Sequence, residues 1–270
     1  MSLKRKSSDR FPSSLKPKKQ LGQNFLIDQN IARKIIQTCH LQPTDTVLEI
    51  GPGRGALTAE LLPRVKKVIA IETDRRLIEE LRKKFPQDNL ELIHADFLKF
   101  DVRSLERNCI AISNLPYYIC SPIIAKILDY KEFFSSLFVT VQLEFGNRMK
   151  AKINTKDYSA FSLFVQYHAD CEMLFKIRNT AFRPRPKVQS CFMQLRMRKK
   201  PSLAIKNEFL FWRLIRQAFT QRRKTIVNAL SSIISKDKSS VLLALIKVNP
   251  HSRPENLSLE DFANLANAIE

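Results

Sequence analysis

Between residues 46 and 142 the sequence alternates short runs of β-branched and aliphatic residues with longer segments of helical periodicity. The apolar runs cover residues 46–50, 67–72, 90–96, 109–114 and 136–142. This alternation is typical of a largely parallel sheet whose strands are connected by helices. It therefore predicts an α/β fold.

Each of the first four runs has a polar residue at or near its carboxyl end. These residues are Glu49 with Gly51 after it, Glu72, Asp96 and Asn114. In open α/β sheets the ligand binds beyond the carboxyl ends of the strands. We expect these four positions to converge on one crevice.

Composition limits the environment and the partners of the chain. With 46 Lys and Arg against 26 Asp and Glu, the 270 residues carry a formal charge of +20, which indicates a polyanionic partner. No apolar run approaches the roughly 18 residues of a membrane span, and no signal-peptide pattern is evident, which favours a cytoplasmic protein. The five cysteines have no CxxC spacing, which argues against a zinc site and a disulfide framework, so we expect no metal.

Beyond residue 161 the pattern changes. Two alternating runs, 171–178 and 188–198, flank a proline-rich turn and indicate an antiparallel pair that closes the sheet. From residue 206 onward the apolar spacing is helical, with a last helix at Leu259–Ile269 after a capping-box-like Ser258 and Asp261. We therefore predict a basic, disordered arm at 1–20, a Rossmann-like domain at 21–200 and a helical domain at 201–270.

The positive charge is concentrated in one quarter of the chain. Residues 173–236 hold 16 Lys or Arg and one acidic residue, Glu208, and so carry 15 of the 20 net charges. A solvated helix face normally mixes both signs, so this segment is predicted to bind a polyanion. Arg213, Arg216, Arg223 and Lys224 are expected to share one helix face.

The segment EIGPGRGALT, residues 49–58, places a glycine-rich turn between a strand and a helix. Its G-x-G-x-G spacing differs from the dinucleotide fingerprint, and alone it is equally well explained as a tight turn. Glu72 lies 21 residues after Gly51, where a carboxylate can accept the hydroxyls of a ribose. With Asp96 at the next strand end and no Walker lysine, S-adenosylmethionine fits this pattern better than ATP or NAD.

The stretch NLPYY, residues 114–118, ends the fourth apolar run. It can be a simple strand terminator, because proline blocks further sheet pairing. It also has the groups that would hold an exocyclic amine: the Asn114 carbonyl, a chain made rigid by Pro116, and the Tyr117 ring, on which a base can stack for roughly 1–3 kcal/mol. The role of Tyr118 stays open.

Seven stretches in order along the chain carry a resemblance to a known family. They are LGQNFLID (21–28), EIGPGRGALT (49–58), IETD (71–74), HADF (94–97), NLPYYICSP (114–122), AFRPRPKVQS (181–190) and AFTQRRKTIVNAL (218–230). With them the chain resembles the ribosomal RNA adenine N6-dimethyltransferase family, and within it the bacterial members that act on the small subunit. The resemblance implies a Rossmann-like class I S-adenosylmethionine-dependent methyltransferase domain followed by a small all-helical domain.

The resemblance also implies roles for individual residues. The cofactor would be bound by Asn24, Leu26, Gly51, Gly53, Glu72, Asp96 and Asn114. The target adenine would be held by Asn114, Leu115, Pro116 and Tyr117, with Phe182 as a second stacking surface. The RNA would be bound by Arg183, Arg185, Lys187, Arg222, Arg223 and Lys224.

The implied reaction is dimethylation of two adjacent adenosines in the 3′-terminal hairpin loop of 16S rRNA, by a monomer with a role in ribosome biogenesis. Two alternatives stay open: an Erm-type methyltransferase of 23S rRNA, and a ribosome-assembly factor that binds RNA without catalysis. Gln189, Leu143 and Cys120 depart from the family pattern. They leave room for altered RNA contacts, whereas the chemistry is expected to survive.

Overall fold

The computed structural model describes residues 17, 22–199 and 203–269. The chain forms two compact units, one of residues 1–142 with 173–194 and the other of residues 143–172 with 195–270. The predicted single boundary near residue 200 differs from this division, because residues 143–172 belong with the C-terminal helices. The predicted arm at 1–20 lies outside the described residues except for residue 17.

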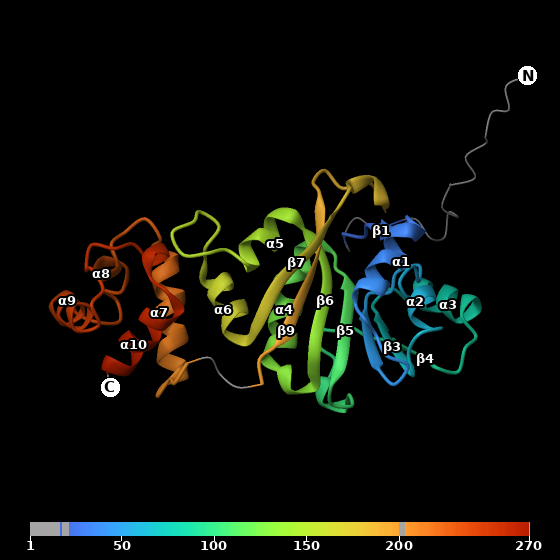
Figure 1. The fold of residues 1–270 in the computed structure, drawn as a ribbon, viewed down its shortest axis with the longest axis horizontal. Coiled ribbons are helices and arrows are strands. Elements are labelled where there is room, and N and C mark those ends of the chain that lie inside the picture. The colour runs from blue at the N-terminus through green and yellow to red at the C-terminus, as the bar shows by residue number, and fades with distance from the viewer. Residues whose placement is uncertain (1–16, 18–21, 200–202, 270) are drawn as a thin grey trace, which may run out of the picture. The chain divides into compact units, whose positions relative to one another are not determined.

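A seven-stranded sheet runs through the protein in the order β4-β3-β2-β5-β6-β9-β7 (Figure 1). The pairs β2 with β3, β3 with β4, β2 with β5 and β5 with β6 are parallel, which confirms the α/β fold. The strands are β2 Thr46–Ile50, β3 Lys67–Glu72, β4 Leu90–His94, β5 Cys109–Asn114, β6 Phe134–Gln142, β7 Ala169–Ile177 and β9 Ser190–Met197.

The strand order reverses beside β2. From β2 the chain builds β3 and β4 on one side, and then returns to place β5 and β6 on the other side. Helices that follow these strands must leave in opposite directions, which opens a crevice at the carboxyl ends of β2 and β5. This is a topological switch point, where open α/β sheets bind their ligands.

The helices of the first unit are held by specific caps. Asp28 accepts the N–H groups of Asn30 and Ile31 at the start of α1 (Gln29–Thr38), and Asp74 accepts the N–H of Arg76 at the start of α3 (Arg75–Lys84). The other helices of this unit are α2 (Thr58–Leu61) and α4 (Cys120–Asp129). Side-chain oxygens at these positions satisfy N–H groups that have no partner within the helix.

A second, two-stranded sheet joins segments that are far apart in the sequence. β1 (Phe25–Leu26) pairs antiparallel with β8 (Phe182–Arg183). Leu26 and Phe182 are both buried in the core of the first unit. The segment that precedes α1 is thereby attached to the body of this unit.

The second unit is mainly helical and also includes one end of β7 and one end of β9. Its helices are α5 Leu143–Met149, α6 Ala160–His168, α7 Glu208–Thr220, α8 Ile226–Ala229, α9 Lys236–Leu245 and α10 Leu259–Ile269. Leu163 and Tyr167 of α6 pack in one buried cluster with Phe211 of α7 and Phe262 of α10, which explains why residues 143–172 belong to this unit.

The structure can be compared with two predictions about the helices of the second unit. The predicted last helix is confirmed, and Ser258 and Asp261 exchange hydrogen bonds of 2.8 and 3.1 Å at its start. The predicted common helix face is wrong, because α7 ends at Thr220 and Arg223 and Lys224 lie in the turn after it. Within the described residues, no helix is long and apolar enough to cross a membrane.

We expect Gly55→Ala to destabilise the protein more than Gly51→Ala. Both glycines have positive φ, +75° and +69°, so an alanine costs about 1–2 kcal/mol of backbone strain at either site. A Cβ at Gly55 would also lie 2.4 Å from the buried Phe85 ring, whereas at Gly51 no atom lies within 4 Å. Overpacking should add about 1–3 kcal/mol for Gly55→Ala. Equal midpoints in urea unfolding of the two variants would contradict this packing argument.

Candidate active site

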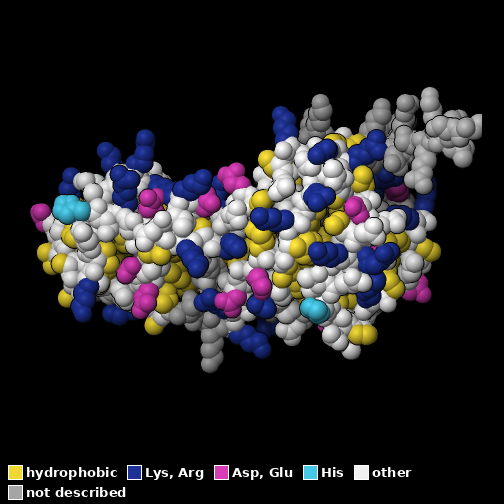
Figure 2. All heavy atoms as spheres, turned by 45° about the horizontal axis from the view of Figure 1, so that its top comes forward, with side chains coloured by type: hydrophobic (Ala, Val, Ile, Leu, Met, Phe, Trp, Pro, Cys, Tyr) yellow, Lys and Arg dark blue, Asp and Glu magenta, His cyan; other side chains and the backbone are white. Residues whose placement is uncertain are grey.

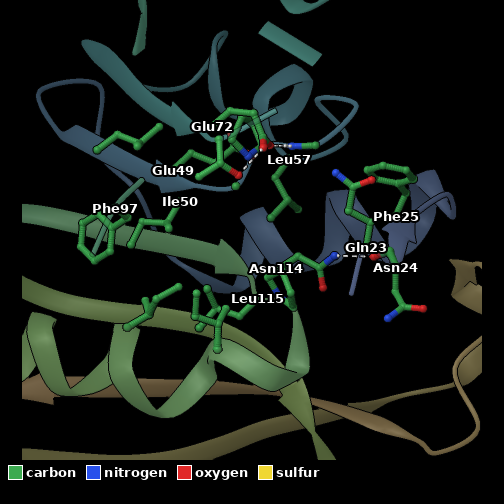
Figure 3. Close-up of a pocket in the computed structure, with 18 of the residues that line it drawn as sticks. Gln23, Asn24, Phe25, Glu49, Ile50, Leu57, Glu72, Phe97, Asn114 and Leu115 are labelled. Atoms are coloured by element: carbon green, nitrogen blue, oxygen red, sulfur yellow. Dashed lines mark hydrogen bonds between the residues drawn. The ribbon is translucent and has the colours of Figure 1, made fainter. Parts of the chain in front are cut away.

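A cleft with a cavity volume of about 230 Å³ lies at the carboxyl ends of the central strands. It is large enough for a small organic molecule. The structure brings nine of the sequence-predicted site residues together in its walls. Figure 3 labels Asn24, Glu72, Asn114 and Leu115 among them. These nine are Asn24, Leu26, Gly51, Gly53, Glu72, Asp96, Asn114, Leu115 and Pro116.

Glu72 and the glycine-rich turn form one side of the cleft. Glu72 is 6% exposed, and it accepts the N–H of Gly53 at 3.2 Å and the N–H of Asp74 at 2.9 Å. Gly53 has a φ of +58°, and a Cβ there would come within 3.0 Å of the Phe25 ring. Burial raises the pKa of Glu72, and the hydrogen bonds from the N–H groups offset only part of this effect. Oε1 also accepts the Thr73 hydroxyl at 3.4 Å, whereas Oε2 accepts the Gly53 N–H and retains a lone pair for the hydroxyl of a sugar.

Glu49 is a site residue to which the sequence analysis gave no role of its own. It lines the cleft, is 1% exposed, and accepts the Thr58 hydroxyl at 2.7 Å. Burial raises the pKa of Glu49 to about 7, and the charge of Glu72 acts in the same direction. The signal available in the sequence was a carboxylate inside the apolar run TVLEI.

Asp96 and Phe97 form the wall that follows β4. Asp96 accepts the N–H of Leu98 at 2.9 Å, which orients its carboxylate. The Phe97 ring is 3% exposed and also lines the cleft. A carboxylate beside an aromatic ring can accept an amine of a purine while the ring packs against its apolar face.

Asn114 ends β5 opposite these groups. Its Nδ2 donates to the main-chain oxygen of Asn24 at 3.1 Å, as the dashed line in Figure 3 shows. The side chain of Asn24 donates in turn to the carbonyl of Gly22 at 3.1 Å. With Nδ2 engaged, Oδ1 is the atom of Asn114 with which the amide can accept a hydrogen bond from a ligand.

Two predicted stacking residues are not among the residues that line the cleft. The Tyr117 hydroxyl is 2.8 Å from the Ser190 hydroxyl, and the ring is half-buried. Phe182 is 3% exposed and packs in the core of the first unit, so a base could stack on it only after the ring was uncovered. The sequence pattern could not distinguish a buried ring beside a proline turn from an exposed one.

Tyr118 is the tyrosine of this stretch that does line the cleft. Its side chain is 60% exposed. A Cβ at Gly22 would lie 2.8 Å from its ring, so the absence of a side chain at Gly22 lets the ring pack on the backbone there.

The predicted basic residues lie in two short segments of the chain, 183–187 and 222–224. Figure 2 shows Lys and Arg side chains spread over the face in view, with fewer acidic ones among them. Arg185, Lys187, Arg223 and Lys224 are exposed, whereas Arg183 is half-buried. The Arg185 Nε donates to Asn179 at 2.9 Å.

Arg222 differs from its neighbours. Its guanidinium donates to the Glu255 carboxylate at 2.6 Å and to the carbonyl of Thr155 at 3.1 Å, and it also bonds the carbonyl of Lys156. These contacts join three segments of the second unit. Arg222 therefore has structural partners in the protein, and its contact with RNA stays a prediction.

In the described parts of the chain, no group of three or more His, Cys, Asp or Glu side chains has an arrangement that could hold a metal ion.

Comparison with known proteins identifies relatives along nearly the whole chain. The model of the family described as "Ribosomal RNA adenine dimethylase" matches residues 14–270. The "Ribosomal RNA small subunit methyltransferase A" of Moorella thermoacetica is 41% identical over 269 residues, which cover 95% of this chain and 93% of that protein.

Two solved structures are similar in fold. The dimethyladenosine transferase of Plasmodium falciparum superposes with a TM-score of 0.78 at 28% identity, covering 89% of this chain and 95% of that one. The 23S rRNA methyltransferase ErmE superposes with a TM-score of 0.71 at 28% identity, covering 91% of this chain and 99% of that one. Both likenesses include the class I methyltransferase fold and the helical region.

We expect Glu49→Gln to remove part of the pH dependence of stability. The pKa of Glu49 is about 7 in the folded protein and near 4.5 when the carboxyl is fully solvated. Between these values the folded state binds more protons than the unfolded state, so the free energy of unfolding falls as pH rises, by on the order of 1 kcal/mol per pH unit. Glutamine keeps the size of the side chain and does not titrate. In urea unfolding at pH 5 and pH 8, wild type should lose more stability than the variant; equal losses would show that Glu49 is not held in its neutral form.

Proposed function

The chain belongs to the ribosomal RNA adenine dimethylase family, and we propose that it transfers methyl groups from S-adenosylmethionine to the N6 atoms of adenosines in ribosomal RNA. The observation that carries this proposal is the orientation of Asn114. Its Nδ2 is engaged by Asn24, and this leaves the Oδ1 acceptor for an incoming amine.

A second acceptor comes from the main chain. The Pro116 carbonyl accepts the N–H of Ile119 at 3.1 Å and the Cys120 thiol at 3.5 Å. The carbonyl of Leu115 is therefore the candidate acceptor beside Asn114. Two acceptors can bind both protons of an exocyclic amine, which directs its lone pair out of conjugation with the ring and toward a methyl donor.

The departure at Cys120 is compatible with this arrangement. The resemblance places Ser or Thr there, and the buried thiol donates to the Pro116 carbonyl as a hydroxyl would. Burial raises the pKa of Cys120 to about 12, so the thiol keeps its proton. The turn that holds Leu115 and Pro116 is thereby retained.

The cleft fits the proposed cofactor through its donor set. Glu72 would accept the ribose hydroxyls, and Asp96 would accept the adenine amine beside the Phe97 ring. Gly51 and Gly53 permit close approach of the backbone, and Asn24 and Leu26 also line the cleft. When bound, S-adenosylmethionine supplies an electrophilic methyl group on a sulfonium.

No residue is assigned as a general base. With the methyl group supplied by the sulfonium, the amine would lose its proton after the transfer, so the residues of the pocket would need only to hold the amine in place. The pocket of Asn114 and Leu115 must also accept an amine that already carries one methyl group.

The small-subunit substrate is favoured over the Erm-type alternative by the degree of similarity. The chain is 41% identical to the Moorella protein, which is named for the small subunit, and 28% identical to ErmE. We propose the two adjacent adenosines of the 3′-terminal hairpin loop of 16S rRNA as targets, as the resemblance implies. We also propose that the protein is a cytoplasmic monomer and acts during ribosome biogenesis.

A purely binding role would not need this set of groups. Burial of Glu49 and Glu72 opposes ionisation, so keeping both carboxyl groups in the cleft costs stability. The presence of both beside Asn114 favours the enzyme over a non-catalytic assembly factor.

The direct test is methylation of unmodified small subunits with radiolabelled S-adenosylmethionine, followed by mapping of the modified nucleotides. Label on two adjacent adenosines of the 3′-terminal hairpin of 16S rRNA is the expected result. Label in 23S rRNA, when large subunits are offered in parallel, would favour the Erm-type function. Absence of label in both would overturn the catalytic proposal.

We expect Asn114→Ala to lower methyl transfer at least 100-fold, because one of the two amine acceptors is lost. The affinity for RNA should stay within a few fold of wild type, since binding of the RNA backbone uses other residues. Single-turnover methylation and filter binding measure the two quantities. Transfer at the wild-type rate would exclude Asn114 from the chemistry.

We expect Arg223→Ala with Lys224→Ala to flatten the salt dependence of RNA binding, while the free energy of unfolding stays near that of wild type. Both side chains are exposed, and each phosphate contact contributes about one unit to the slope of log K against log salt. Filter binding between 50 and 300 mM KCl measures the slope.

Arg222→Ala is the matched comparison. Loss of its contacts with Glu255 and Thr155 should lower the free energy of unfolding by about 1–3 kcal/mol. An unchanged slope in the double variant would place Arg223 and Lys224 outside the RNA interface.

A further inference from the structure

Lys126 in α4 binds the turn that carries Asp96 and Phe97. Its Nζ donates to three main-chain carbonyls: that of Phe97 at 2.8 Å, that of Leu98 at 2.9 Å and that of Phe100 at 2.6 Å. An ammonium group has three N–H donors, and all three are used here. Nζ also lies 5.3 Å from the centre of the Phe97 ring.

The turn itself resembles the last turn of a helix. The N–H groups of Lys99 and Phe100 both bond the carbonyl of Asp96, at 2.9 and 3.0 Å. The Phe97 carbonyl also accepts the N–H of Phe100 at 3.2 Å and so has one bond within the turn. A cation is the favourable group for the carbonyls at such an end. Lys126 thus satisfies the acceptors of a segment with no regular secondary structure.

The same segment carries the two groups proposed to contact adenine. Asp96 is oriented by the N–H of Leu98, whose own carbonyl is bound by Lys126. Phe97 lies between Asp96 and Leu98 in the chain, and Lys126 also donates to its carbonyl. Movement of the turn would displace the carboxylate and the ring together.

The element that carries Lys126 is itself part of the site. Helix α4 begins at Cys120, three positions after Tyr117, and Ile123, one turn before Lys126, lines the cleft. Lys126 therefore connects the helix behind the amine-holding stretch to the turn at the end of β4.

We propose that Lys126 is a positioning residue that holds Asp96 and Phe97 in place to recognise the adenine ring of the cofactor. This inference rests on the proposed function, because it takes S-adenosylmethionine as the ligand of the cleft. Lys126 itself does not line the cleft, so it would act on the cofactor only through the turn that it holds.

The chemistry of the site requires a lysine. Arginine presents its donors in a planar fork, whereas the three carbonyls surround a single point. Methionine matches the length of the side chain and has no donor. Burial lowers the pKa of Lys126, and the charges of Asp96 and Asp101 offset part of that shift.

The test compares S-adenosylhomocysteine with its purine analogue that lacks the exocyclic 6-amino group. Calorimetry on the full chain measures binding of both by wild type, by Lys126→Met and by Lys99→Met. Lys99 is an exposed lysine in the same turn, so its replacement removes the same charge and serves as the matched control.

We expect Lys126→Met to weaken binding of S-adenosylhomocysteine about tenfold or more. Binding of the 6-deamino analogue should weaken less, by about threefold, because its contact with Asp96 is already absent and only its packing on Phe97 can be lost. Lys99→Met should match wild type with both ligands. Should Lys126→Met not fold, Lys126→Gln, which retains one donor amide, takes its place with an intermediate loss of the same selectivity.

Three outcomes overturn the inference. Equal weakening of both ligands by Lys126→Met would mean that Lys126 only stabilises the fold. Unchanged binding of both ligands by Lys126→Met would mean that the turn keeps its position without Lys126. Weakening of S-adenosylhomocysteine binding by Lys99→Met to the same extent would mean that Lys126 acts only through its charge. Failure of wild type to bind S-adenosylhomocysteine would instead refute the proposed function.

Discussion

The parallel pairing of β2 with β5 is the constraint on which the rest of the first unit depends. Ile50 is opposite Ser113 in that register, and the Ser113 hydroxyl donates to the Ile50 carbonyl. The pairing places the glycine-rich turn after β2 and the Asn114 stretch after β5 at the same edge of the sheet. Because the chain leaves these two strands in opposite directions, the edge between them stays open. The cleft follows from strand order before any particular side chain is considered.

The buried carboxyl groups that line this cleft lower the stability of the folded protein. Burial raises the pKa of both Glu49 and Glu72, and the charge of Glu72 raises that of Glu49 further. Hydrogen bonds from Thr58 and from backbone N–H groups offset only part of these shifts. A core made for stability alone would hold apolar residues there. Retention of two carboxyl groups at one strand edge is therefore better explained by a positively charged or hydroxyl-bearing ligand than by folding.

Local sequence predicted the parts of the site that lie at strand ends. Glu72, Asp96 and Asn114 were found because a polar residue that follows an apolar run has few structural explanations, and the α/β alternation placed those ends together. Asn24 and Leu26 came only from the family resemblance, since two residues of strand carry no pattern. Phe182 was predicted to stack and is in the core, because whether a ring is covered depends on packing that the sequence does not describe.

Long-range hydrogen bonds set the limit of such prediction. Arg222 belongs to a run of three basic residues, and its partners Thr155 and Glu255 are more than 30 positions away in either direction. Lys126 likewise bonds a turn that precedes it by more than 25 positions. A lysine on a helix and an arginine in a basic cluster have no local mark that separates a solvated cation from one enclosed by carbonyls.

The pairing of β1 with β8 determines when, during synthesis of the chain, the wall of the cleft that includes β1 can fold. Phe25 and Leu26 emerge from the ribosome early, whereas their partners Arg183 and Phe182 are among the last residues of the first unit to be synthesised. Contacts of such separation form late, because the intervening chain must be present and ordered. A nascent chain that ends before β8 therefore lacks the strand partner of one cleft wall, and the wall that orients Asn114 becomes secured only when nearly the entire first unit has left the exit tunnel.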